Sequence, residues 1–79
     1  MSYATGKTPI WQAIADALRS DLAEGRYGLG DKLPTEADLA HRFGVNRHTV
    51  RHGISALVDE GLIRTRRGAG AFVAAQPTD

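Results

Sequence analysis

The chain has 79 residues, no cysteine and a formal net charge of +1 at pH 7. A chain of this length forms one small domain that buries only about 60% of the surface of its unfolded form, which leaves little room for an enclosed catalytic cavity. Without cysteine it can hold neither disulfides nor thiolate metal sites, and the composition suits the reducing cytoplasm. No segment approaches the roughly 20 apolar residues of a membrane span. We therefore expect a soluble cytoplasmic protein that does not enter a membrane.

Charge is divided unevenly along the chain. Residues 1–38 carry four basic and six acidic side chains, a balance of −2, whereas residues 39–79 carry six basic and three acidic side chains, a balance of +3. All six basic side chains of the second half are arginines, whose fork of donors fits phosphate oxygens and guanine. The second half is therefore the candidate surface for a polyanion, with an ordinary solvated charged surface as the alternative.

The first helix is predicted to begin near Thr8 and to end at Gly25. Thr8 is a favourable N-cap, Pro9 suits the first helical position, and Gly25 is a favourable C-cap. Residues 1–7 show no periodicity, so we expect them to form a flexible tail. The apolar stripe of this helix comprises Ile10, Trp11, Ile14, Ala15, Leu18 and Leu22.

A compact connection and a short second helix follow. Residues 25–34 hold three glycines and a proline, with room for a short strand at 32–34. Thr35 and Asp38 form a capping-box pair that starts a helix ending at Gly44. Its predicted core residues are Leu39, Ala40 and Phe43.

The third helix is predicted over residues 46–60, capped by Asn46 and ended by Gly61. Gly53 lies inside it, at a cost of about 1 kcal/mol relative to alanine, which indicates close contact with a neighbouring helix. The predicted apolar stripe comprises Val50, Ile54, Leu57 and Val58.

The segment 64–73 predicts a β-hairpin with an arginine-bearing tip. Arg66 and Arg67 precede a Gly-Ala-Gly turn that begins at Gly68, and glycine allows a backbone to approach a sugar-phosphate strand closely, besides making the turn. Three helices followed by this hairpin predict a mainly α winged helix-turn-helix domain over residues 8–74, with a C-terminal tail at 75–79.

The polar side of the third helix is the candidate reading surface. Arg47 and Arg51 lie one turn apart in the part of a recognition helix that meets base edges, and each can address guanine O6 and N7. No acidic residue lies between Leu39 and Val58 to pair with them, so we favour a role in DNA binding over a solvent-exposed salt bridge. The candidate DNA-contacting residues are Thr35, Arg47, His48, Thr49, Arg51, Arg66, Arg67 and Gly68.

Several of these residues have a structural alternative. Thr35 serves adequately as a helix cap, as Glu36 does as a first-turn charge. His48 and His52 have the i, i+4 spacing of a zinc motif, but the glutamate of HExxH and any thiol are missing, so we expect no metal and no cofactor. We expect His48 to contact phosphate or a base, and His52 to be exposed.

Four segments, taken in order, resemble the DNA-binding domain of the GntR family of bacterial transcription regulators: LPTEADLA, FGVNRHTVR, LVDEGLI and RRGAGAFV. The resemblance implies that Arg47, Thr49 and Arg51 occupy DNA-contacting positions and that Gly68 approaches the minor groove. Two positions depart from the family pattern. Asn46 replaces a more usual serine or threonine, and Ala37 replaces an arginine that touches phosphate in many members. The phrase VNRHTVRHGI is similar to the subgroup that regulates phosphonate metabolism, in the branch whose effector domain resembles chorismate lyase.

The resemblance implies a repressor that binds a palindromic operator, with helix 46–60 in the major groove and hairpin 64–73 at the minor groove. Most members continue into an effector domain that forms a homodimer and binds a small molecule, so residues 75–79 would begin the linker to such a domain; the alternative is a small free-standing regulator. An enzyme is disfavoured because no nucleophile and base are paired in the pattern. The stronger rival is a winged-helix module that binds protein or RNA, against which the basic first turn of the third helix argues.

Overall fold

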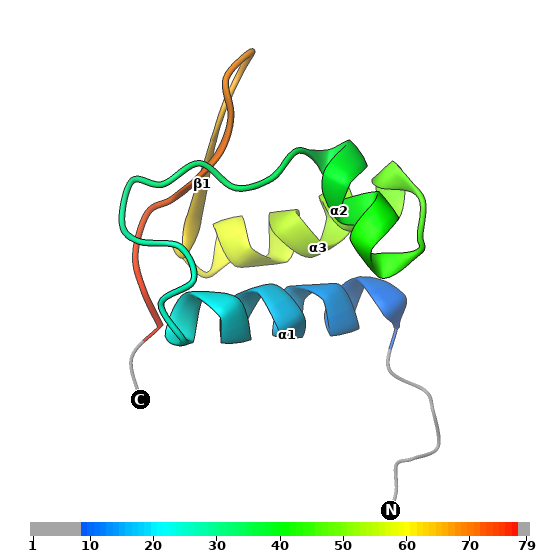
Figure 1. Ribbon diagram of the computed structural model, residues 1–79, viewed down its shortest axis with the longest axis horizontal. Coiled ribbons are helices and arrows are strands. Elements are labelled where there is room, and N and C mark those ends of the chain that lie inside the picture. Colours follow the sequence, from blue (N-terminus) through cyan, green and yellow to red (C-terminus); the bar gives the residue numbers. More distant parts are fainter. Residues whose placement is uncertain (1–8, 78–79) are drawn as a thin grey trace, which may run out of the picture.

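The computed structural model describes residues 9–77, which form three helices and one antiparallel hairpin. The elements are α1 (Ile10–Ala23), α2 (Glu36–Phe43), α3 (Arg47–Asp59), β1 (Ile63–Arg66) and β2 (Gly70–Val73). Helix α1 lies along α3, α2 lies beside the N-terminal end of α3, and the hairpin rises from the other end of α3, away from α1 (Figure 1). The winged helix-turn-helix prediction is confirmed, whereas the predicted tail over 1–7 and Thr8 lie outside the described residues. The first helix begins at Ile10 with Pro9 as its N-cap, one residue later than predicted.

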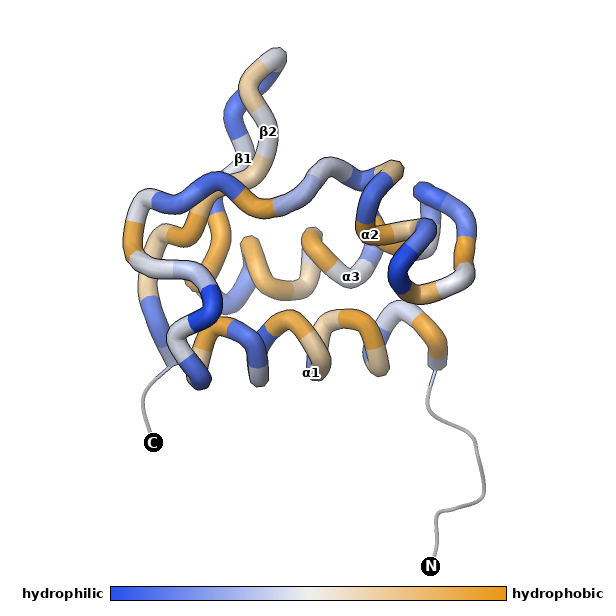
Figure 2. Tube along the Cα trace, viewed as in Figure 1, coloured by the Kyte–Doolittle hydropathy of each residue, from blue (hydrophilic) through white to orange (hydrophobic). Residues whose placement is uncertain are grey.

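The core forms mainly between α1 and α3, and Figure 2 shows apolar residues concentrated along these two helices. The predicted stripes are largely correct, but Ile10 is 61% exposed and Val58 is 37% exposed. Ile10 is the first residue of α1, and Val58 flanks the row of α3 residues turned to the core, so neither packs fully. The most deeply buried side chains are Ile14, Leu18, Leu22, Leu39, Val50 and Leu57.

A buried carboxylate joins the first two helices. Asp21 of α1 is 6% exposed, and its Oδ2 accepts a hydrogen bond of 2.9 Å from Nη1 of Arg42 at the end of α2. This bond raises the pKa of Arg42 above its ordinary value. A buried charge is tolerated only when it is paired, so the ion pair helps to fix α2 against α1.

The capping residues of α2 behave as the sequence predicts. Thr35 Oγ1 accepts a hydrogen bond of 3.1 Å from the amide of Asp38, and Asp38 Oδ2 accepts one of 3.4 Å from the amide of Thr35. Gly44 then ends the helix with a φ of +68°. The reciprocal bonds satisfy amides that the first turn of a helix leaves without partners.

We expect Thr35→Ala to lower the free energy of unfolding by about 1 kcal/mol because it removes the acceptor for the Asp38 amide. Urea unfolding followed by circular dichroism measures the change. Thr35→Ser, which keeps a hydroxyl acceptor, is the matched control and should unfold nearly as the unchanged chain does. Equal losses in both variants would show that the hydroxyl is not the stabilising group.

Gly53 lies where α3 crosses α1. A β-carbon built at Gly53 would lie 3.0 Å from the carbonyl oxygen of Trp11 and 3.1 Å from Cγ2 of Ile14. Such distances are shorter than ordinary van der Waals contact. The predicted close approach of two helices at this glycine is therefore confirmed.

The wing, defined as β1, β2 and the turn between them, is anchored at its base by the buried pair Ile63 and Val73. The connection between α1 and α2 also pairs with β2, through one bridge, Lys32 to Phe72, and a hydrogen bond of 2.8 Å from the Leu33 amide to the Ala71 carbonyl. The predicted short strand at 32–34 is thus reduced to a single bridge. Pro34 has no amide hydrogen with which to extend the pairing.

Candidate nucleic-acid interface

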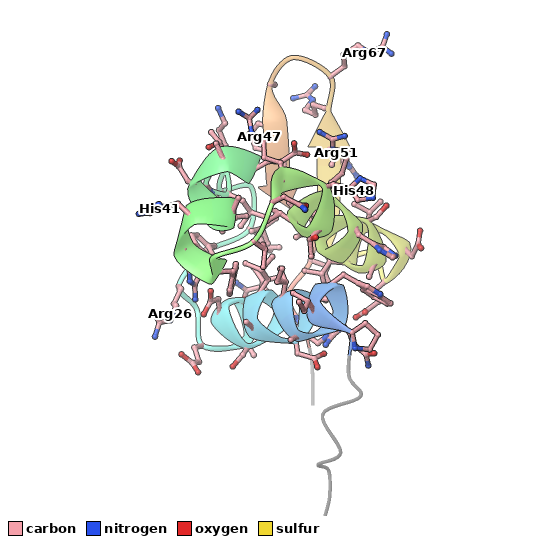
Figure 3. All side chains as sticks on the ribbon, turned by 90° about the vertical axis from the view of Figure 1, so that its right-hand side faces the viewer. Arg26, His41, Arg47, His48, Arg51 and Arg67 are labelled. Carbon is pink, nitrogen blue, oxygen red and sulfur yellow. The ribbon has the colours of Figure 1, made fainter. Side chains whose placement is uncertain are left out.

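The outward residues of α3 lie on the side of the molecule from which the wing rises. Arg47, His48 and Arg51 are all exposed, as predicted. Figure 3 shows Arg47 and Arg51 on this side, with Arg67 at the far end of the wing and α1 on the opposite side. The first turns of α3 and the wing therefore lie on the same side of the molecule.

The N-terminal turn of α3 is held by its cap. Asn46 Oδ1 accepts a hydrogen bond of 2.9 Å from the amide of Thr49 and another of 3.0 Å from the Thr49 hydroxyl. The Thr49 side chain is half-buried and its hydroxyl proton is engaged within the protein. Its oxygen and methyl group are the parts that remain for a DNA contact. This arrangement fixes the orientation of the turn that carries Arg47 and His48.

Arg51 has an acidic partner that the sequence did not reveal. Its Nε and Nη2 donate hydrogen bonds of 3.1 and 2.9 Å to the two carboxylate oxygens of Glu36. The expectation that no carboxylate accompanies Arg51 was wrong because Glu36 belongs to α2, which the turn between the helices brings alongside α3. The hydrogen bond from Arg51, aided by the charge of Arg47, holds the pKa of Glu36 below its ordinary value. The same bond raises the pKa of Arg51.

The arginines of the described part of the chain fall into two groups. Those on or near the helix bundle form ion pairs with carboxylates, whereas those of the wing and the first residue of α3 have no carboxylate within ion-pair distance in residues 9–77. Such unpaired cations can neutralise phosphates without first breaking an internal pair. The paired arginines are Arg19, Arg26, Arg42 and Arg51, and those without a carboxylate partner are Arg47, Arg64, Arg66 and Arg67.

A cleft of about 450 Å³ separates the helices from the wing. Four predicted site residues line it, two from the helical side and two from the wing, and Lys32 and Glu36 line it as well. Lys32 was not among the binding residues predicted from the sequence. Its position directly before the Leu-Pro segment that leads into α2 could have indicated that it lies near this surface. The four predicted residues in the cleft are Thr35, Arg47, Arg66 and Gly68, while His48, Thr49, Arg51 and Arg67 lie outside it.

The two histidines of α3 have different surroundings. The ring of His52 stacks on Trp11 of α1, with ring centroids 4.3 Å apart and an angle of 18° between the planes. His48 is exposed on the preceding turn. Over residues 9–77, no group of three histidine, cysteine or acidic side chains is placed to hold a metal ion. Stacking on Trp11 is a structural role for His52 that the sequence pattern did not suggest.

No helix among the described residues is both long and apolar enough to cross a membrane.

Together, the three helices, the exposed basic turn of α3 and the wing define a winged helix-turn-helix domain. Comparison with known families gives a match to the family described as bacterial regulatory proteins, gntR family, over residues 10–73. The chain belongs to this family. The predicted family is thus confirmed.

Individual relatives agree with this assignment. The chain is 45% identical over 78 residues to the probable transcriptional regulator PhnF of Escherichia coli K12, covering 99% of this chain and 32% of that protein. It is 44% identical over 64 residues to the uncharacterized HTH-type transcriptional regulator RB1450 of Rhizobium meliloti, covering 81% and 26% of the two chains. The chain therefore spans about a quarter to a third of the length of these relatives.

Solved structures show the same fold. The DNA-binding domain of AraR in complex with operator ORE1 superposes with a TM-score of 0.86 at 34% identity, covering 94% of this chain and 89% of that one. The N-terminal domain of AraR in complex with the mutant operator ORR3 gives 0.83 at 36% identity, covering 87% and 99%. Both neighbours are bound to operator DNA in these structures.

Proposed function

We propose that this chain binds a double-stranded DNA operator sequence-specifically and thereby regulates transcription as a repressor. The observation that carries the proposal is the gathering of exposed arginines without carboxylate partners on the first residue of α3 and on the wing. The operator complexes of AraR and the repressor names of MngR from Escherichia coli and NagR from Bacillus subtilis support it. Repression would follow from occupying the operator.

The contacts divide by chemistry. The first turns of α3 enter the major groove, where Arg47 and Arg51 each present paired donors to guanine and His48 meets a neighbouring base or phosphate. The positive end of the α3 dipole adds attraction for phosphate. Phosphate contacts fix position and base contacts carry the sequence information, so the two arginines determine specificity.

The cleft and the tip of the wing hold the duplex beside the helix. Thr35 and Arg66, which both line the cleft, contact the phosphate strand that separates the two grooves. Arg67 and Gly68 meet the minor groove, where a narrow groove concentrates negative potential that attracts arginine. Gly68 has a φ of +76°, a conformation that side-chain-bearing residues rarely adopt, so it also makes the turn that carries Arg67.

The remaining features concern the full-length protein. We propose that it acts in the cytoplasm as a homodimer on a palindromic operator, with residues 75–79 starting a linker to an effector domain that binds a small molecule. A phosphonate-related role for that effector remains a prediction. A single copy of residues 8–74 would occupy one half-site, so binding by this chain alone should be weak and should fall steeply with salt.

Selection of bound fragments from random duplex DNA tests the proposed function. We expect enrichment of a short guanine-containing half-site, with affinity that decreases as salt rises because phosphate contacts release counterions. Two half-sites arranged as a palindrome would show that two copies act together. Absence of any enriched sequence would contradict the proposal and favour a winged-helix module that binds protein or RNA.

Glu36 gives a separate prediction about specificity. We expect Glu36→Gln to tighten binding to random duplex DNA, because it removes a negative charge from the cleft. We also expect it to lower the ratio of operator affinity to random-DNA affinity, because Arg51 loses the carboxylate that orients it through two hydrogen bonds. The pKa of Glu36 is lowered, so this carboxylate is ionised at neutral pH and the substitution changes its charge there. Fluorescence anisotropy with both duplexes measures the two effects.

Glu24→Gln is the matched control, because Glu24 is exposed at the end of α1 and the change in net charge is the same. It should leave the affinity ratio unaltered. A Glu36→Gln variant with an increased preference for the operator would show that Glu36 competes with DNA for Arg51 and does not orient it.

A further inference from the structure

One face of the wing carries an arginine, Arg64, that has no role in the DNA contacts proposed above. Arg64 and Arg66 are two residues apart on β1, so their side chains leave the same face of the hairpin, and their cross-strand partners Phe72 and Gly70 share that face. Thr65 lies on the other face, which is turned to the cleft, and Arg66 and Gly70, nearer the tip, line the cleft as well. The side bearing Arg64 and Phe72 is called here the outer face of the wing.

The outer face is hollowed. A depression of about 320 Å³ is lined by Gly30, Arg64, Arg66, Phe72, Val73 and Ala74. No carboxylate lines it, and neither arginine has an ion-pair partner among residues 9–77. Asp31, which follows Gly30, turns one carboxylate oxygen to the amide of Gly28 at 2.8 Å. The depression therefore offers the guanidinium group of Arg64 to an anion, beside the half-buried ring of Phe72, while Arg66 is shared with the cleft.

The shape of the minor groove suggests what this anion is. The groove is only about 6 Å wide, and its two walls are the two phosphate backbones of the duplex. A wing whose tip enters the groove has one backbone beside each of its faces. The cleft face meets the strand that separates the wing from α3, so the outer face meets the strand on the far wall.

We propose that the outer face binds the phosphodiester backbone of this far strand, with Arg64 on a phosphate oxygen and Phe72 against the neighbouring deoxyribose. The inference rests on the proposed function and extends it, because it adds a site and a residue, Arg64, that the reading of bases does not require. Contacts to both walls hold the wing in the groove and add a phosphate contact without adding sequence information.

The salt dependence of binding tests this site. On the duplex enriched by the selection above, we expect Arg64→Ala to reduce the slope of log affinity against log salt by about 0.9, the value for one lost phosphate contact. Arg64→Lys, which keeps the charge, should restore most of the slope. The matched control is Arg26→Ala, which removes the same charge in the connection after α1, far from the wing (Figure 3). It should leave the slope unchanged.

The strand is identified by neutralising single phosphates. A methylphosphonate on the far strand, at the minor groove that the wing occupies, should weaken binding of the unchanged chain and leave binding by the Arg64→Ala variant unaffected. An Arg64→Ala slope equal to that of the unchanged chain would overturn the site while leaving the proposed function intact. Failure of the unchanged chain to bind any duplex would overturn both.

Discussion

Replacing Arg47 and Arg51 together by alanine is expected to abolish the preference for the operator over random duplex DNA. Both side chains are exposed on the first turns of α3, on the side shared with the wing (Figure 3). A good bidentate arginine–guanine pair contributes about 1 to 3 kcal/mol of discrimination, so losing both removes most of the base reading. Competition binding with the selected operator and a scrambled duplex measures the loss.

Two further measurements separate base reading from folding and from charge. Circular dichroism of the double alanine variant should be unchanged, because neither side chain lies in the core. Replacement of both arginines by lysine keeps the charge but removes the planar fork, so it should retain affinity for random DNA and lose the preference. A double alanine variant that still prefers the operator would favour the protein- or RNA-binding module.

Replacing Gly53 by valine is expected to lower the free energy of unfolding by about 3 kcal/mol, at the upper end of the usual cost of overpacking. The first added carbon already lies 3.0 Å from the backbone oxygen of Trp11, and a backbone atom cannot move aside as a flexible side chain can. Valine adds two more carbons at the same place. Urea unfolding measures the loss, which is large for a domain of this size.

Ser55→Val is the matched control for Gly53→Val. Ser55 is exposed on the same helix, so valine there changes helix propensity without entering the contact with α1. We expect a change within about 0.5 kcal/mol, as for most surface substitutions. Equal stability of the two valine variants would contradict the close approach of α1 and α3.

The parts of the fold that the sequence predicts are those determined by near neighbours in the chain. Thr35 and Asp38 cap α2, and Asn46 caps α3, as their positions indicate. Glycines end the helices where the pattern places them: Gly25 and Gly61 follow α1 and α3 with φ values of +79° and +80°. Each signal is a hydrogen bond or a backbone conformation within a few residues, so no tertiary information is needed.

The errors arise where one element must be placed against another. The pairing of Arg51 with Glu36 joins residues 15 apart, and its occurrence depends on the angle between α2 and α3. The stack of Trp11 on His52 depends in the same way on how α1 crosses α3. Apolar periodicity identified the side of each helix that faces the core, but it could not show how far a neighbouring helix covers that side. Ile10 is exposed for this reason.

The most direct measurement of the central claim is binding to operators in which single guanines of the selected half-site are replaced by 7-deazaguanine. This base keeps its pairing but lacks the N7 acceptor in the major groove. If Arg47 and Arg51 read guanine from α3, affinity of the unchanged chain should fall at the guanines they contact, by part of the roughly 1 to 3 kcal/mol of a full bidentate pair. The double alanine variant should be insensitive to the replacement. Equal binding of the unchanged chain to normal and 7-deazaguanine operators would contradict major-groove reading by α3.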